Sequence, residues 1–226
     1  MKLNTNRNTY IIIYSVILVV IVAFLLAFIF KALKPMQDAN VALDVKKQIL
    51  YSLNIRGLDG QEAEQKYADV VSAEEKVGDN YYYICKVDGQ KKYVFPMKGM
   101  GLWGGISGFV SVDDDLNTIY GAYFNHESET AGLGAEIKDS QEWQELFQGK
   151  KIFGPDGQLA IGVVKKVENP ESQVDAITGA TLTSNGVSDM LRDGFSLYAT
   201  LFEEIQKRER IIEDAHKHND EGEYNE

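Results

Sequence analysis

Cysteine, histidine and positive charge are all scarce in this chain of 226 residues. Its one cysteine, Cys85, cannot form an intrachain disulfide or a thiolate metal cluster alone, and its place in a strand pattern favours a small buried hydrophobe. Lysine and arginine number 23 against 34 acidic residues, a formal net charge of −11. This acidic balance, without a basic stripe, argues against nucleic acid as a partner, because phosphate backbones are bound by lysine and arginine.

Several common site motifs are also missing. The stretch Gly99–Gly108 is rich in glycine and carries Trp103, but it lacks the Lys-Ser/Thr pair of a P-loop and the spacing of a dinucleotide fingerprint. Close backbone approach to a planar group or partner and an ordinary irregular loop both remain open for it. The acidic triplet Asp113–Asp115 lacks the rest of a calcium-binding loop, which favours a solvated turn. No metal site is expected.

One long apolar run is present near the start. After a polar segment (1–9), residues 10–30 carry no charge, which is long enough to span a bilayer as a helix. The run is too long for a typical signal peptide, and no small-x-small cleavage site follows it. We therefore expect a retained, single-pass anchor, whose orientation the flanking lysines do not determine.

The rest of the chain predicts an α+β fold. Helical periodicity and polar spacing predict a helical linker or stalk over 31–72, with helices near 41–53 and 61–71. One domain is expected over 73–212, and a polar, disordered tail over 213–226. The domain is expected to begin with a hairpin over 81–97 that turns at Asp88-Gly89, followed by a second hairpin over 109–124. A short amphipathic turn over 143–147, a last strand over 159–167 and a last helix over 185–210 complete it.

Two polar clusters stand out in this pattern. Residues 125–134 leave a strand and hold His126, Glu129, Thr130, Leu133 and Gly134. A His and carboxylates can bind metal or act as acid and base, but hydrogen bonding to a cofactor or to the glycine-rich stretch explains them with fewer assumptions.

The second cluster is the run Asp175-Ala-Ile-Thr-Gly-Ala-Thr-Leu-Thr-Ser184, directly before the last helix. A turn that opens a helix presents free N–H groups and a positive dipole end, which suits a phosphate. An ordinary N-cap by Thr183 or Ser184 is the alternative.

Together these motifs resemble the C subunits of the sodium-translocating NADH:quinone reductases, and more distantly the G subunits of the Rnf ferredoxin complexes. The resemblance rests on the N-terminal span, Gly101-Leu-Trp-Gly104, His126-Glu-Ser-Glu-Thr-Ala-Gly-Leu-Gly134, and Asp175 before Thr178-Gly-Ala-Thr181. Ala131 stands where the family pattern has proline, and the Gly105-Ile-Ser run also departs from it.

The resemblance implies a domain that carries FMN covalently, through a phosphoester to Thr181, with Thr183 as a rival acceptor and Thr178 less favoured. It implies a cofactor-binding set made of the attachment motif and a pocket: Asp175, Thr178, Gly179, Ala180, Thr181, Leu182, Thr183, Ser184, Trp103, His126, Glu129, Thr130, Leu133 and Gly134.

The implied role is an electron-carrying subunit, without catalysis of its own, in an inner-membrane complex that couples NADH oxidation by quinone to sodium export. The implied partners are the other subunits and a flavin transferase, with the soluble domain on the periplasmic face. The equivalent Rnf subunit and a cofactor-free, membrane-anchored binding domain are the alternatives.

Overall fold

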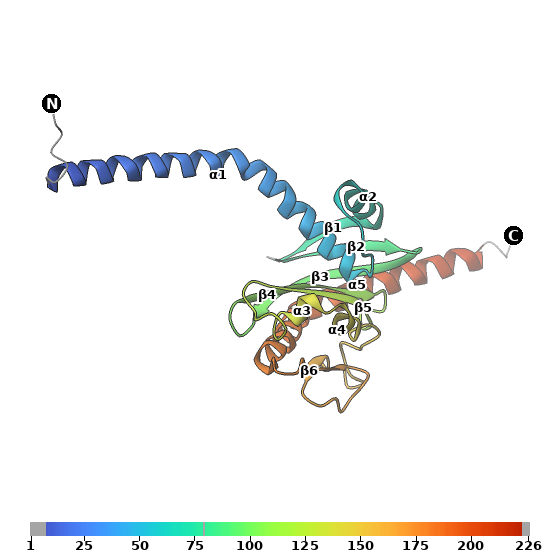
Figure 1. Ribbon diagram of the computed structural model, residues 1–226. Coiled ribbons are helices and arrows are strands. Elements are labelled where there is room, and N and C mark those ends of the chain that lie inside the picture. Colours follow the sequence, from blue (N-terminus) through green and yellow to red (C-terminus); the bar gives the residue numbers. More distant parts are fainter. Residues whose placement is uncertain (1–7, 79, 223–226) are drawn as a thin grey trace. The chain divides into compact units, whose positions relative to one another are not determined.

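The computed structural model describes residues 8–78 and 80–222 (Figure 1). The chain divides into two compact units, Met1–Val45 and Lys46–Glu226, and each is described by itself. Most of the predicted polar N-terminus and residues 223–226 of the predicted tail lie outside the described residues.

A single long helix, α1 (Asn8–Ser52), contains the whole uncharged run from Tyr10 to Phe30. The large apolar side chains of this run are exposed, and by length and composition the helix could cross a membrane. Pro35 lies inside the helix and does not end it, although a proline there removes one backbone hydrogen bond. These features are consistent with the predicted anchor.

A five-stranded antiparallel sheet in the order β1-β2-β3-β4-β5 forms the centre of the second unit (Figure 1). Its strands are β1 (Val71–Val77), β2 (Asn80–Val87), β3 (Gln90–Met100), β4 (Gly105–Asp113) and β5 (Ile119–His126). Each strand pairs with its neighbour in the chain. The predicted α+β class, with an antiparallel sheet and flanking helices, is therefore confirmed.

Both predicted hairpins are present. The β2–β3 turn places Asp88 and Gly89 at φ 50° and 82°, the left-handed pair that an Asp-Gly turn favours between strands. In the β4–β5 turn, the Asp115 carboxylate accepts hydrogen bonds from the N–H groups of Asn117 and Thr118, at 2.9 and 2.8 Å. The acidic triplet therefore stabilises a turn.

The glycine-rich stretch forms a tight turn between β3 and β4. β3 continues to Met100 and β4 begins at Gly105, and the turn is closed by a hydrogen bond from Gly101 N–H to the Gly104 carbonyl at 2.9 Å. A Cβ added at Gly99 would lie 2.7 Å from the Met190 Cβ. The glycines therefore let this turn approach α5 of the same chain closely, whereas the approach to a planar group or partner stays a prediction.

Strand β1 is not predicted by the sequence. Its sequence, Val-Ser-Ala-Glu-Glu-Lys-Val, contains three charged residues in a row, and it pairs with β2 at the edge of the sheet. Charged side chains on an edge strand are common because they discourage pairing with other chains. The hydrophobic pattern therefore carries little signal for this strand.

A short parallel pair replaces the long strand predicted over 159–167. The pair consists of β6 (Gly162–Val164) and β7 (Gln173–Asp175), in the register Val164↔Asp175. The pairing ends where Lys165 and Lys166 become exposed. The prediction of one strand was wrong because the apolar run continues outside the paired residues, where Leu159 makes an isolated bridge with Phe153.

Two short helices follow β5, α3 (Glu136–Asp139) and α4 (Gln141–Glu145). The rings of Trp143 and Phe147 pack against Phe124, with centroid distances of 5.7 and 5.1 Å. The amphipathic turn predicted here is thus present.

The last helix, α5 (Thr181–Gly222), is longer than predicted at both ends. Between Thr181 and its end the chain has no proline, and Gly222 is the first glycine after Gly194. Because nothing in the polar segment stops a helix, the disorder predicted after residue 213 is replaced by helix up to Gly222.

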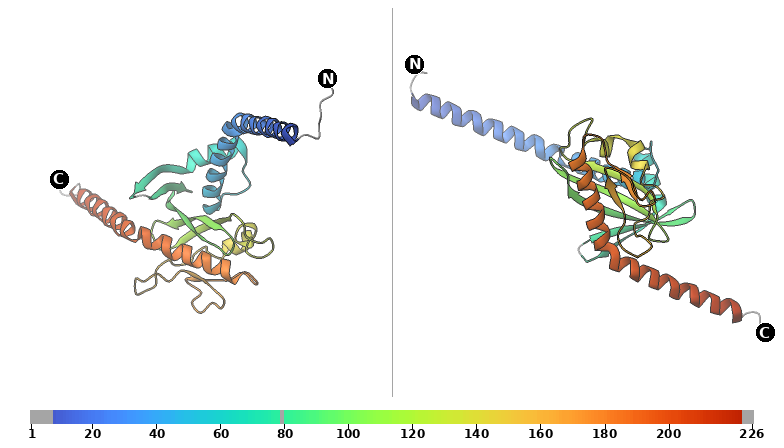
Figure 2. Two further views of the ribbon diagram at one scale, coloured as in Figure 1. Left: turned by 90° about the vertical axis from the view of Figure 1, so that its left-hand side faces the viewer. Right: turned by 90° about the horizontal axis from the view of Figure 1, so that it is seen from below.

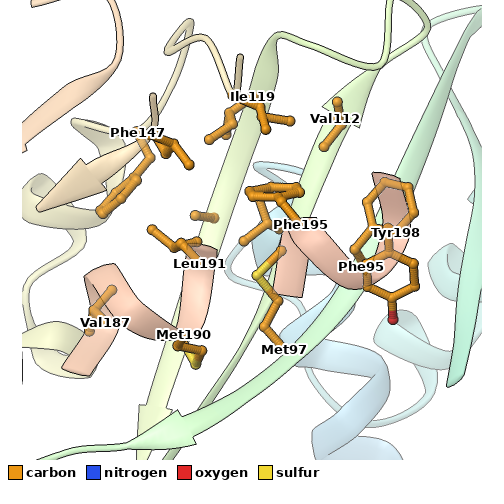
Figure 3. Packing of buried hydrophobic residues seen from close by; sticks show 14 of the residues in the cluster. Phe95, Met97, Val112, Ile119, Phe147, Val187, Met190, Leu191, Phe195 and Tyr198 are labelled. Carbon is orange, nitrogen blue, oxygen red and sulfur yellow. The ribbon is translucent and has the colours of Figure 1, made fainter. Parts of the chain in front are cut away.

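α5 crosses one face of the sheet and buries its apolar stripe there (Figures 2 and 3). Gly194 allows close approach, since a Cβ there would lie 3.0 Å from the Met97 sulfur. The predicted apolar positions of the helix are all buried: Val187, Met190, Leu191, Phe195, Tyr198, Leu201, Phe202 and Ile205. Each such side chain contributes about 1.5–3 kcal/mol on burial, so this packing holds the helix against the sheet.

The other face of the sheet is contacted by the end of α1. Ile49, Leu50 and Leu53 are buried, and the Ser111 hydroxyl donates to the Ser52 carbonyl at 2.5 Å. The predicted second helix is present as α2 (Gly60–Val70), with the Asp59 side chain capping its first turn.

Candidate functional site

The second polar cluster, residues 175–184, forms a turn between β7 and α5. Gly179 has φ +80°, a left-handed conformation that glycine adopts without strain. The Ala180 N–H donates to the Ile177 carbonyl at 3.0 Å, and Thr181 is the first residue of the helix. The motif therefore ends directly on the first turn of α5.

The predicted N-caps are corrected by this geometry. Because α5 begins at Thr181, Thr183 and Ser184 lie inside its first turn and are not caps. The Ser184 hydroxyl instead accepts a hydrogen bond from the Ile177 N–H at 3.1 Å. Ser184 thus fastens the turn to the helix that follows it.

The threonines of the motif differ in accessibility. Thr178 and Thr181 are exposed, as are Gly179 and Leu182. Thr183 is only 1% exposed, and its hydroxyl donates to the Glu129 carboxylate at 2.6 Å. Thr181 is therefore accessible to solvent, whereas Thr183 is buried and its hydroxyl is already hydrogen-bonded.

Glu129 is a buried carboxylate that joins three segments of the chain. One oxygen, Oε2, accepts from Thr183 in α5, and the other, Oε1, accepts from the Trp103 N–H at 2.9 Å. Its own N–H donates to His126 Nδ1 at 3.2 Å, at the end of β5. The carboxylate therefore faces protein, although the resemblance placed Glu129 among the pocket residues.

The surroundings of Glu129 favour its charged form. Burial alone would raise the pKa of this carboxyl, but the hydrogen bonds from Thr183 and from the backbone of the β3–β4 turn lower the pKa below its ordinary value. Glu129 is thus an ionised acceptor at neutral pH. Because His126 Nδ1 accepts a hydrogen bond, a neutral His126 carries its proton on Nε2.

Two glycines leave room for this carboxylate. A Cβ at Gly101 would meet Glu129 Oε1, and a Cβ at Gly134 would meet Glu129 Oε2 and lie 2.6 Å from the Thr183 hydroxyl. A Cβ at Gly186 would likewise meet the Met100 carbonyl. The Gly-x-x-Gly turn, the Gly-x-Gly segment and α5 are therefore packed directly on one another.

Exposed apolar side chains lie on the segments that meet at the turn before α5. Trp103 is 67% exposed and Leu182 59%, while Leu133 abuts the turn, with its Cδ2 2.9 Å from a Cβ built at Gly179. Met100 and Leu102 are also exposed, with exposed fractions of 70% and 46%. The sequence analysis did not place these two residues in the pocket, although Met100 directly precedes the Gly-Leu-Trp-Gly turn and Leu102 lies within it.

The structure thus brings the two predicted clusters and the glycine-rich turn together. Thr130 is exposed, and its carbonyl accepts from the N–H groups of Leu133 and Ala135, which closes the loop after β5. Asp175 is exposed, and its carbonyl accepts from Trp143 Nε1 at 2.9 Å. Cys85 lies apart in β2, where burial raises the pKa of its thiol to about 12, as expected for a structural cysteine.

The comparisons with known proteins identify the class of this site. The family model for the FMN-binding domain matches residues 101–196, a range that begins at the β3–β4 turn and includes residues 175–184. The chain therefore carries an FMN-binding domain.

Similar proteins of known structure show to which family of FMN-binding proteins this chain belongs. The chain is 38% identical to the C subunit of the Na(+)-translocating NADH-quinone reductase from Parabacteroides distasonis, whose crystal structure it matches with a TM-score of 0.69 over 75% of this chain and 96% of that chain. It belongs to the family of these C subunits.

Two further relatives agree with this assignment. The C subunit of the Pseudomonas aeruginosa enzyme is 36% identical over 141 residues, 58% of this chain and 54% of the relative. The chain spans about half the length of the curated relatives that it matches. A crystal structure of NqrC from Shewanella oneidensis, 22% identical with a TM-score of 0.63 over 73% of this chain and 97% of that chain, shares the fold.

The residues present fit FMN. A phosphate monoester needs a hydroxyl and hydrogen-bond donors, which Thr181 and the first-turn N–H groups of α5 provide. A planar isoalloxazine needs apolar surface, which Trp103, Leu133 and Leu182 provide.

Proposed function

We propose that this chain carries FMN on Thr181, through a phosphoester between the threonine hydroxyl and the flavin phosphate. The observation that carries the proposal is the contrast between two threonines in one helical turn. Thr181 is exposed, whereas the hydroxyl of Thr183 is buried and already donates to Glu129. Thr178 is also exposed, but it lies on the far side of Gly179 and outside the helix.

The first turn of α5 favours the phosphate that remains after esterification. The first N–H groups of a helix have no acceptor within the helix, and they lie at the positive end of its dipole. The net charge of −11 makes such a local donor set more important, because the acidic chain as a whole repels anions. Thr181 places its substituent at this helix end.

The side chains around the turn would orient the ring and restrict water. Trp103 and Leu133 present apolar surface on two separate loops, and Leu182 presents it from α5 itself. A flavin bound here supplies the electron-transfer chemistry, while the protein supplies attachment, orientation and polarity. No residue of this set is needed as an acid, base or nucleophile.

The wider role follows from the family. We propose an electron-carrying subunit of a sodium-translocating NADH:quinone reductase in the inner membrane, with the FMN domain on the periplasmic side and α1 as its anchor. The partners would be the other subunits and a flavin transferase that loads Thr181. The uncharged run of α1 offers no group for a sodium path, so sodium would move through other subunits.

Flavin fluorescence in a denaturing gel tests the attachment. The full chain, produced together with its transferase, should give a fluorescent band, because a covalent flavin survives denaturation. Thr181→Val should remove the band, whereas the matched variant Thr178→Val should keep it. A fluorescent Thr181→Val band, or a dark wild-type band from the native host, would refute the proposal.

A further inference from the structure

A buried carboxylate lies beneath the exposed attachment turn, in contact with both sides of the site. We infer that Glu129 is a positioning residue that assembles the flavin site before any cofactor is attached. It does so by joining the turn that carries Trp103 to the helical turn that carries Thr181. The identity of the site rests on the proposed function, but the geometry of the junction does not.

The three joined segments are distant in sequence. Trp103 lies 26 residues before Glu129, and Thr183 lies 54 residues after it. The carboxylate uses a different oxygen for each, at 2.9 and 2.6 Å. The Glu129 side chain thus sets the distance between the Trp103 turn and the first turn of α5.

Besides its close approach to Gly186 of α5 at Met100, the Trp103 turn depends on few hydrogen bonds. The side chains of Leu102 and Trp103 are exposed and do not pack in the core. The turn is fixed by the Gly101–Gly104 backbone bond and by its hydrogen bonds to Glu129. Without the carboxylate, these backbone donors would lose their acceptor, a loss that costs free energy in a water-poor site.

The glycines indicate that the space is reserved for the carboxylate. Any side chain at Gly101 or Gly134 would meet Glu129 oxygens. Both glycines have a backbone conformation outside the positive-φ region, so space and not backbone angle requires them. The Gly-x-x-Gly turn and the Gly-x-Gly segment therefore both leave space for the Glu129 carboxylate.

Hydrogen exchange of the flavin-free full chain tests the inference. The chain would be produced without a transferase and studied in detergent, with peptides that cover residues 101–104 and 181–186. In Glu129→Gln, one carboxylate oxygen becomes an NH2 group and the charge is lost, so the donors of the two segments compete for one weaker, neutral acceptor, and both segments should exchange about 10-fold faster. The matched control is Glu127→Gln, because Glu127 is exposed and its carboxylate accepts a longer, 3.3 Å bond from Gly105.

A second pair of variants separates positioning from general stability. Thr183→Val removes one donor and should accelerate exchange only in 181–186, while Thr183→Ser should restore the wild-type rate. The wavelength of Trp103 fluorescence emission should shift in Glu129→Gln but not in Thr183→Val. Since Trp143 also fluoresces, the Trp103→Phe variant shows which part of the emission comes from Trp103.

The outcomes are distinct. Equal exchange in Glu129→Gln and Glu127→Gln, or faster exchange spread evenly over the sheet, would overturn the inference. If Glu129→Gln does not fold, the Thr183 pair decides, and equal rates for Val and Ser would overturn it. Because no flavin is present, a failure of the proposed attachment at Thr181 leaves these results interpretable.

Discussion

Gly179 is the position where one methyl group should perturb the attachment turn most directly. Its φ is +80°, and an added Cβ would lie 2.9 Å from Leu133 Cδ2. A left-handed alanine costs about 1–2 kcal/mol, and reduced entropy of the unfolded chain offsets about 0.4–1 kcal/mol of that. The contact adds about 1 kcal/mol, at the low end of overpacking costs, because Leu133 is 41% exposed and can move.

Gly179→Ala should therefore destabilise the domain by about 1–2.5 kcal/mol, or about 2–10 °C in Tm for a unit of this size. Gly157→Ala is the matched control, since Gly157 has φ +75° and no atom within 4 Å of an added Cβ. Without the contact, Gly157→Ala should cost about 1 kcal/mol less than Gly179→Ala, or about 2–4 °C less in Tm. The difference between the two variants isolates the contact with Leu133.

The double variant Gly179→Ala/Leu133→Ala completes the test. In this double variant, the Tm loss caused by Gly179→Ala is measured relative to Leu133→Ala alone. Because the leucine side chain is absent, this loss should be close to the loss that Gly157→Ala causes in the wild type. Tm is measured by thermal unfolding of the flavin-free full chain in detergent, for the wild type, the three single variants and the double variant. Equal losses for the two glycine variants, or no recovery in the double variant, would refute the assigned packing of the turn.

Three further predictions concern the rest of the domain. Phe195→Ala should destabilise it by about 3–5 kcal/mol in urea unfolding, because Phe195 is fully buried, whereas Leu197→Ala, at a 57% exposed position, should change stability by less than about 0.5 kcal/mol. Lys92→Ala should cost about 2 kcal/mol, since it removes the 2.6 Å pair with a half-buried Asp113, while Lys91→Ala, with a 3.8 Å exposed pair, should cost under about 1 kcal/mol. Cys85 should resist iodoacetamide in the folded protein up to about pH 9 and react on unfolding, because burial raises the pKa of its thiol from 9.0 to about 12. Mass spectrometry would detect the adduct, and rapid labelling of the folded protein would contradict the burial of Cys85.

The strong local signals of the sequence predicted the sheet and its helix well. The Asp88-Gly89 turn and the apolar stripe from Val187 to Ile205 depend on neighbouring residues alone, and both are confirmed. Strand β1 was missed because its charged residues lie at a sheet edge, where burial imposes no pattern. Strand β7 was missed because three paired residues are too few for a periodic signal.

The site was predicted as residues but not as an arrangement. Motifs indicated Thr181, Glu129 and Trp103, yet a local pattern cannot show that Thr183 bonds a carboxylate 54 residues away. The same long-range contact shows that Thr183 is no helix cap, contrary to the sequence-based alternative. Met100 and Leu102 were missed because their exposure depends on how the β3–β4 turn packs against α5.

The mass of one peptide tests the central proposal most directly. Protein from its native host would be digested, and the peptide that contains residues 175–190 would be fragmented to locate any added group. We predict an addition equal to FMN minus water on Thr181, with Thr178 and Thr183 unmodified. Flavin on Thr183 or Thr178, or an unmodified peptide from the native host, would contradict the account.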